Sequence, residues 1–561
     1  MRTKLSFLMA MLVIASLLLS ACGDTKTPTA TEVAPVVTEE APVATEEAPV
    51  ATEEAPAATE EAPAATEEAP AAPARYPKLT LGLANDPVDL TPLNYNGKPE
   101  IYQLIWENLF DLESGEYIPR LAKGYTEIDE LHWEVELYDY IYDWEGNHIT
   151  ADDVLFAYDY LIQSGTQVKF GLFGSIEKVD DFTVLFTWTA PVNLVGGLEH
   201  ILCRPIIFSQ AAFEAGDFAT QPVGTGPYVV TEFISGSKVV LDANDSYWQT
   251  DEILKSYRQQ QNVQTIEYVI ITEPAQHVIA LQAGDINYSE RVPQESLGDF
   301  QDGGAYDAEY NVYPRLQGKQ WLLVPNESEG HIGADQNFRL AVYYAIDNSA
   351  IAQVTGGAAT GSKAFGSPAF SDYNPAWEAT PNYINTFDPD LAQEYLAQTA
   401  YDGEKLILLA SNDPETANIT TVVQAFLANV GINTEIVLKD GREVAGLQSD
   451  PTAYDICINW IGGGYQIGSW NRPLNFNEFG MDKSMGFIHD QTMQDMFMTA
   501  NTIVTHTEEN MNALHQYILD HAYLYHLAYG TGFSVYSSDI LELVYRENTS
   551  FLPSASTYQL P

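Results

Sequence analysis

The stretch NWIGGGYQIGSW, residues 459–470, combines large aromatic rings with consecutive glycines. Rings provide contact area for stacking, and glycines let another molecule approach the backbone, whose N–H groups can donate hydrogen bonds. This combination suits non-covalent binding of a flat or bulky neutral ligand. A tight turn with the tryptophans in the core is the alternative. The candidate binding residues here are Trp460, Gly462, Gly463, Gly464, Tyr465 and Trp470.

Patterns for catalysis or metal binding are weak. His515, His521 and His526 stand six and five positions apart, whereas a zinc pair on one helix face needs a spacing of about three or four. Residues 361–363, GSK, lack the Gly-Lys-Ser/Thr order of a phosphate-binding loop. Neither His-Glu-x-x-His nor Gly-x-Ser-x-Gly occurs. We therefore predict no catalytic residue, no metal, no cofactor and no enzymatic activity.

Apolar periodicity predicts a mixed α/β fold to position these residues. The segment EIYQLIWENLFD, residues 100–111, is predicted as a helix, and another helix begins at Thr150, with Asp153 in capping position. Residues 405–438 read as strand, helix and strand, a βαβ-like unit with Gly431 as the helix C-cap.

The N-terminus has the pattern of an export signal. Arg2 and Lys4 precede a nearly apolar run, residues 5–19, that is too short for a membrane span. The quartet LSAC, which ends at Cys22, resembles a bacterial lipobox. We expect residues 1–21 to be a signal peptide and Cys22 to be acylated, which would anchor the protein to the membrane.

Residues 22–74 are predicted to be a lipid anchor followed by a disordered tether. The unit TEEAPVA or TEEAPAA recurs every seven residues, beginning at Thr38, Thr45, Thr52, Thr59 and Thr66. Each unit contains a proline and no large aliphatic seam residue, which excludes a continuous coiled coil. Its Pro, Glu, Ala and Thr composition is typical of an extended spacer.

The rest of the chain is strongly acidic. Removing the three basic and twelve acidic side chains of residues 1–74 from the totals of 25 and 78 leaves 22 against 66, a net charge of −44. This charge argues against nucleic acid or an anionic membrane surface as a partner. Cys203 and Cys457 lie in apolar runs, so two buried thiols are favoured over a disulfide, although the pairing stays open.

Several segments, in order, resemble one family. They are ITADDVLFAYDYL, VGTGPYVVTEFISGSKVVLDANDSYW, IALQAGDIN, NFRLAVYYAIDNSAIAQV and YDICINW. Together they resemble the extracytoplasmic solute-binding proteins of ABC importers, in the oligopeptide and dipeptide class (family 5). The block at residues 223–248 is the most specific.

The resemblance implies two α/β lobes joined by a double hinge. Lobe I would comprise residues 75–314, with an inserted subdomain at about 107–215, and would resume at residues 527–561; lobe II would comprise residues 315–526. Asn94 and Tyr95 would lie in an early loop that faces the ligand cleft in the family, and the alternative is that they are ordinary solvated loop residues.

The resemblance also suggests a question about the ligand. In peptide-binding members, a tryptophan is closely followed by an aspartate that binds the ligand's α-amino group. Here Trp460 is followed by Ile461 and the glycines, and the nearest acids are Asp455 and Glu478. Either an acid from elsewhere in the chain takes the place of that aspartate, or the ligand has no ammonium group at that end. An oligosaccharide would fit the second case.

We therefore expect a monomeric, lipid-anchored receptor on the outer face of the cell membrane, in the periplasm or at the cell surface. It would capture an oligopeptide or an oligosaccharide by hinge closure and deliver it to ABC permease subunits. The alternatives are a secreted hydrolase of peptides or glycans, with carboxylates among the 66 acids, and a surface sensory receptor on the same scaffold.

Overall fold

The computed structural model describes residues 74–93, 99–113, 116–164, 173–195, 197–462, 466–476, 485–546 and 550–560. Several predictions lie outside these residues: the signal peptide, Cys22, the tether, Asn94, Tyr95, Gly463, Gly464 and Tyr465. Within the described residues, no helix has the length and apolar character that a membrane crossing requires.

The described chain is mixed α/β, as predicted, and is organised around one eleven-stranded sheet. The strand order is β15-β14-β16-β12-β17-β11-β1-β10-β9-β8, with β13 beside β17. The strands are β1 (Tyr76–Leu83), β8 (Tyr228–Ile234), β9 (Lys238–Ala243), β10 (Val263–Ile270), β11 (Tyr288–Ser289), β12 (Tyr310–Pro325), β13 (Ala359–Gly361), β14 (Leu406–Ser411), β15 (Thr434–Lys439), β16 (Ile456–Ile461) and β17 (Tyr525–Ser537).

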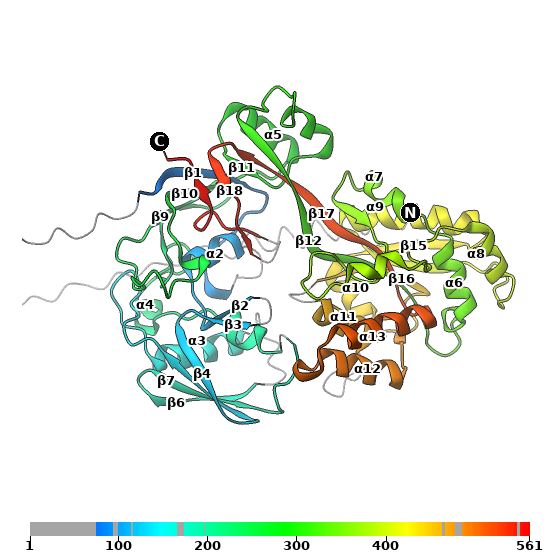
Figure 1. Ribbon diagram of the computed structural model, residues 1–561, viewed down its shortest axis with the longest axis horizontal. Helices are drawn as coiled ribbons and strands as arrows, with labels where there is room; N and C mark the ends of the chain where they lie inside the picture. The colour runs from blue at the N-terminus through cyan, green and yellow to red at the C-terminus, as the bar shows by residue number, and fades with distance from the viewer. Residues whose placement is uncertain are drawn as a thin grey trace, which may run out of the picture. The chain divides into compact units, whose positions relative to one another are not determined.

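Two long strands at the middle of the strand order connect the two halves of this sheet. β12 and β17 are antiparallel neighbours (Figure 1), paired from Tyr310 with Ser537 to Leu323 with Tyr525. Their register shifts between Leu316 and Gln320, and such irregularities bend and twist a strand pair locally. The predicted lobe boundary at residues 314 and 315 falls inside β12, close to this irregularity.

The βαβ unit predicted at residues 405–438 is confirmed. β14 runs parallel to both β15 and β16, and α9 (Pro414–Asn429) connects β14 to β15. Asp413 caps the start of α9 by accepting a hydrogen bond from the Thr416 N–H, and Gly431 follows its end at a φ of 95°. Only glycine adopts that backbone conformation without strain.

The remaining helices between β12 and β17 in the sequence connect the strands of this part of the sheet. They are α6 (Gln336–Tyr344), α7 (Ile351–Val354), α8 (Pro389–Leu396), α10 (Gly441–Leu447), α11 (Gln466–Leu474), α12 (Gln491–Asn501) and α13 (Glu508–His521). α6 packs on α8, and α12 packs on both α11 and α13.

A separate four-stranded sheet lies within the range predicted for the inserted subdomain. Its order is β4-β5-β7-β6, and its strands are β4 (Ala122–Asp129), β5 (His132–Leu137), β6 (Phe173–Asp180) and β7 (Thr183–Trp188). α3 (Ala151–Ser164) packs on β6. The predicted helix start is confirmed, because the Asp153 carboxylate accepts a hydrogen bond from the Thr150 N–H at 2.9 Å.

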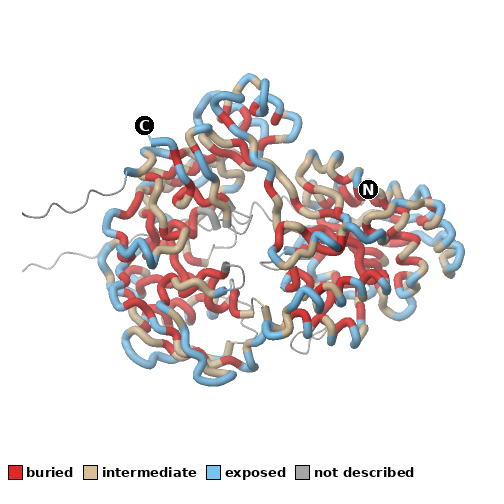
Figure 2. The backbone as a smooth tube through the Cα atoms, viewed as in Figure 1, coloured by how far each residue is buried: buried red, intermediate tan, exposed pale blue. Residues whose placement is uncertain are grey.

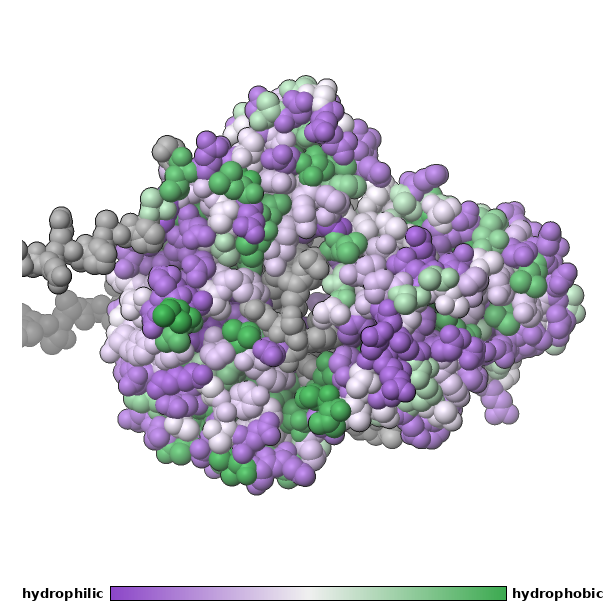
Figure 3. All heavy atoms as spheres, viewed as in Figure 1, coloured by the Kyte–Doolittle hydropathy of each residue, from purple (hydrophilic) through white to green (hydrophobic). Residues whose placement is uncertain are grey.

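Buried residues lie mostly in the interior of the chain trace, and exposed residues lie mostly at its periphery (Figure 2). Hydrophilic residues cover much of the face in Figure 3, consistent with the acidic composition. Cys203 and Cys457 are both buried, and no disulfide joins them. The interpretation as two buried thiols is therefore confirmed.

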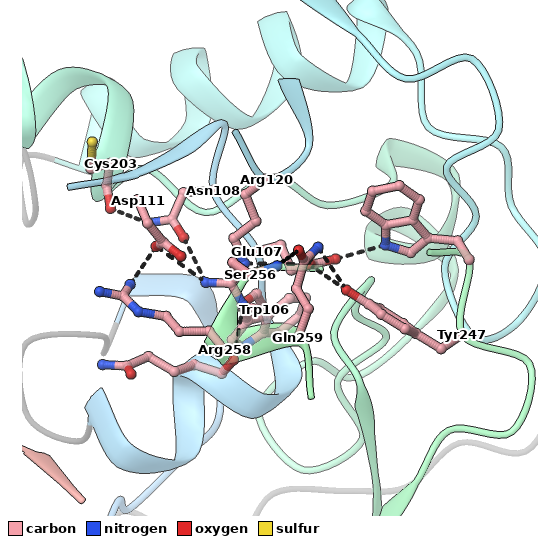
Figure 4. A network of polar contacts seen from close by, with 12 residues as sticks. Trp106, Glu107, Asn108, Asp111, Arg120, Cys203, Tyr247, Ser256, Arg258 and Gln259 are labelled. Atoms are coloured by element: carbon pink, nitrogen blue, oxygen red, sulfur yellow. Dashed lines mark hydrogen bonds and ion pairs between the residues drawn. The ribbon is translucent and has the colours of Figure 1, made fainter. Parts of the chain in front are cut away.

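A buried polar network connects segments that are distant in the sequence (Figure 4). The Glu107 carboxylate accepts a hydrogen bond from Arg120 Nε at 3.3 Å, and Asp111 forms an ion pair with Arg258. All four of these side chains are at most 1% exposed. Glu107 also accepts hydrogen bonds, at 2.8, 2.8 and 3.0 Å, from Tyr247, Trp248 and Gln259.

This network explains where the helix prediction for residues 100–111 is wrong. α2 (Pro99–Ile105) ends before Glu107, and β2 (Phe110–Glu113) begins soon after it. The donors that hold Glu107 come from residues as far away as Gln259, so tertiary contacts override the local apolar period.

We predict that Glu107→Ala lowers the free energy of unfolding by about 3–5 kcal/mol, because the buried charge of Arg120 then loses the Glu107 carboxylate that compensates it. Urea denaturation of the purified protein measures this change. Glu130→Ala, at an exposed glutamate, is the matched control and should change it by less than about 0.5 kcal/mol. Equal effects of the two variants would contradict a stabilising role for the network.

Candidate functional site

The carboxyl ends of β14 and β16 form the edge where the candidate site lies. In open α/β sheets, ligands bind outside the carboxyl ends of parallel strands. Every residue of β16 is buried except Trp460, whose exposed fraction is 44%. Gly462, the first residue after β16, is also exposed. Of the predicted site residues that the structure describes, Trp460 and Gly462 therefore lie together at an accessible edge.

A lysine lies against the aromatic side chains at this edge. Lys319 Nζ is 4.4 Å from the centre of the Trp321 ring and 5.3 Å from that of Trp460. Trp321 and Trp460 are direct partners in the β12–β16 ladder, which places their side chains on the same face of the sheet. Trp321 is only 1% exposed, and its Nε1–H donates to Thr416 Oγ1 of α9 at 2.8 Å. The Trp321 ring is thus held in a fixed position against the Lys319 ammonium group.

Two carboxylates flank the same ammonium group. Lys319 Nζ is 3.5 Å from Asp413 Oδ1 and 3.7 Å from Glu415 Oε2. Burial raises the pKa of Asp413, but hydrogen bonds from Thr416 and the charge of Lys319 outweigh it and hold that pKa below its ordinary value. Asp413 is therefore ionised at neutral pH. One lysine faces two acids here, which leaves an excess of negative charge.

A cavity of about 340 Å³ adjoins this cluster. Lys319, Trp321 and Glu415 line one part of it, and Arg291 is among its other lining residues. A second cavity, of about 260 Å³, shares Glu290, Arg291 and Gln317 with the first. The pair of cavities therefore offers both a basic side chain and acidic side chains to one ligand.

Trp470, predicted as a binding residue, is placed differently. It lies on α11, is 0% exposed, and packs against the rings of Phe365 and Trp377 at centroid distances of 4.7 and 5.9 Å. α11, which begins at Gln466, turns this ring into the core. Trp470 is therefore a packing residue in this structure, and we leave it out of the site proposed below.

Of the three histidines singled out by spacing, His515 and His526 are buried, whereas His521 is half-buried at the end of α13. Burial lowers the pKa of His515 to about 3 and that of His526 to about 4, so both are neutral at physiological pH. The His515 ring stacks on Trp377 at a centroid distance of 4.3 Å. Among the described residues, no group of three or more His, Cys, Asp or Glu side chains is arranged to hold a metal ion.

Sequence reasoning missed Lys319, Asp413 and Glu415. The two acids carry a usable signal, because Asp413, Pro414 and Glu415 follow a predicted strand and open a helix, at the carboxyl edge of a βαβ unit. Lys319 carries none, since its position depends on the register between β12 and β16.

Comparisons with known proteins agree on one family. The family model for bacterial extracellular solute-binding proteins, family 5 (middle region), matches residues 116–480. The periplasmic murein peptide-binding protein MppA of Escherichia coli is 23% identical over 443 residues, which cover 71% of this chain and 76% of MppA.

Solved structures share the fold. A putative peptide-binding protein AppA from Clostridium difficile superposes with a TM-score of 0.70 at 18% identity, covering 86% of this chain and 100% of AppA. NikA from Brucella suis, solved in complex with Fe(III)-EDTA, gives 0.69 at 20% identity, with the same coverage of both chains. The two-lobed fold predicted by resemblance is thereby confirmed.

We predict that Trp460→Ala weakens ligand binding at least about tenfold while leaving the free energy of unfolding within about 1 kcal/mol. Trp470→Ala is the matched control at a buried ring, and should instead lower that free energy by about 3–5 kcal/mol. Titration calorimetry and urea denaturation separate the two effects. Unchanged ligand affinity in Trp460→Ala would remove Trp460 from the site.

Proposed function

Because the chain belongs to the bacterial extracellular solute-binding proteins of family 5, we propose that it is the ligand-capturing receptor of an ABC importer. The family is one of binding proteins, and the match to its model over residues 116–480 is the observation that carries this proposal. The protein would capture a ligand outside the cell membrane and present it to permease subunits.

The proposed ligand is an oligopeptide-class molecule. MppA and AppA are named for peptide binding, and the charges at the edge of the sheet favour a ligand of that kind. Asp413 and Glu415 provide the negative charge that the glycine run after Trp460 lacks. Arg291, on the wall of the same cavity, provides a positive charge for a carboxylate. A ligand with an ammonium group and a carboxylate matches both.

An oligosaccharide is the second candidate, favoured by the exposed ring of Trp460. Sugars stack on such rings without needing a counter-charge. The position of Lys319 over that ring weighs against it, because a stacked sugar would have to displace the ammonium group and leave two carboxylates without it.

Capture would proceed by closure of the two lobes about β12 and β17, the long strands that run between them. The lobes would be residues 75–314 with 527–561, and residues 315–526, with a subdomain inserted at about 107–215. Closure requires that the ligand bind the closed form more tightly than the open form. Acylated Cys22 and the tether of residues 22–74 would hold the monomeric receptor near its permease.

Native mass spectrometry of the gently purified chain from residue 75 onward tests the ligand class. Binding proteins that enclose a ligand can retain it, so we expect a mass above that of the denatured chain. A spread of peptide masses supports the peptide assignment, and hexose-sized steps support the oligosaccharide. Steady turnover of peptides or glycans by the pure protein would contradict a receptor and favour the hydrolase.

A further inference from the structure

The ammonium group of Lys319 is held in a way that is unusual for this chain. It lies over the rings of Trp321 and Trp460 and beside the carboxylates of Asp413 and Glu415. We infer that this arrangement is a cation site for the ligand's ammonium group, and that Lys319 occupies the site until the ligand displaces it. The inference rests on the proposed function and specifies how its ligand is recognised.

The surroundings of Lys319 suit an organic cation. Aromatic faces attract cations, by about 0.5–1 kcal/mol when exposed and more when desolvated. The Trp321 ring is fixed by its hydrogen bond to Thr416, and Asp413 is fixed as the N-cap of α9. The site is thus built from rigid elements, whereas Lys319 reaches it on a flexible four-carbon chain. The walls would stay in place if the lysine left.

Distances show that Lys319 is held loosely. Its carboxylate distances of 3.5 and 3.7 Å are both longer than a charged hydrogen bond, which is about 2.7–2.9 Å. Other lysines of the chain reach that range, such as Lys439 with Glu443 at 2.7 Å and Lys178 with Asp152 at 2.8 Å. Attractions spread over rings and distant carboxylates are each weak, so moving the ammonium group away breaks no short hydrogen bond to a carboxylate.

The location permits exchange. The Lys319 side chain is 25% exposed, and the residue lines the cavity of about 340 Å³ together with Trp321 and Glu415. An incoming ammonium group could therefore enter from the cavity while the lysine moves into solvent. The displaced lysine would keep its charge hydrated, which avoids the cost of burying an unpaired cation.

A purely electrostatic role makes a different prediction. If Lys319 only neutralised Asp413 and Glu415, removing it would strengthen the attraction for any cation near these carboxylates, without contact between that cation and the Trp460 ring. Exchange requires that the added cation take the place of the Lys319 ammonium group against the ring. A gain in affinity that is observed at the Trp460 ring therefore distinguishes exchange from neutralisation alone.

The experiment compares Lys319→Met with Lys405→Met. Lys405 forms an exposed ion pair with Glu435 at 2.9 Å, so its variant makes the same charge change without opening an aromatic site. Each protein carries 5-fluorotryptophan at its nine tryptophans, and the Trp460 resonance is assigned with Trp460→Phe. The probe is n-butylammonium chloride at constant ionic strength, and n-butanol is its neutral counterpart.

We expect n-butylammonium to shift the Trp460 ¹⁹F resonance with an affinity about tenfold higher in Lys319→Met than in wild type or Lys405→Met. Adding Glu415→Gln to Lys319→Met should reverse most of that gain, and n-butanol should have no comparable effect. Equal affinities in Lys319→Met and wild type, no saturable shift in Lys319→Met, or an equal response to n-butanol would each overturn the inference. No natural ligand enters the titration, so its outcome is independent of the mass-spectrometric test of the proposed function.

Discussion

The pairing of β12 with its two neighbours is the constraint on which the rest depends. β12 pairs with β16 on one side and with β17 on the other. It therefore connects the βαβ unit, through β16, to the long antiparallel pair that it forms with β17. The β16 register sets Trp321 opposite Trp460. Lys319, two positions earlier in β12, then lies over both rings. A slip by one residue would turn these side chains to the other face of the sheet.

The same strand pair would connect ligand recognition to the proposed lobe closure. Lys319 lies within the segment of β12 where pairing with β17 is irregular, between Leu316 and Gln320. Gln317, in that segment too, lines both cavities. A change in the bend of β12 would therefore alter the position of the ammonium group relative to its aromatic and acidic neighbours. In the proposed receptor, ligand recognition and lobe closure would share these residues.

The charge distribution of the chain distinguishes Lys319 from its other basic side chains. The chain from residue 75 onward carries a net charge of −44, and cations are scarce in it. Several of its basic side chains compensate buried or capping acids, as Arg120 does for Glu107 and Arg258 does for Asp111. Lys319 differs because its side chain is partly exposed and lies at a cavity wall. A buried pair such as Arg120 with Glu107 stabilises a lobe, whereas a loosely held cation can be exchanged.

Local patterns in the sequence were sufficient for much of the fold. The strand, helix and strand of residues 405–438, the helix start at Thr150 and the turn at Gly431 all follow from short-range chemistry that the structure retains. The helix predicted through residue 111 was wrong because partners far along the chain hold Glu107.

The candidate site could be predicted from sequence patterns only in part. Trp460 was found by its neighbours in sequence, but Lys319 reaches it only through strand register, and the burial of Trp470 depends on how α11 packs. Residue type and spacing report what a side chain can do. They do not report which face of a helix or sheet it takes when several distant elements compete for it.

A crystal structure of the protein with its retained ligand would show whether the ligand displaces Lys319. We expect ligand density against the Trp460 ring, with an ammonium group between Trp460, Asp413 and Glu415 and with the Lys319 side chain turned into solvent. Ligand bound elsewhere, with Lys319 still over the ring of Trp460, would contradict this expectation.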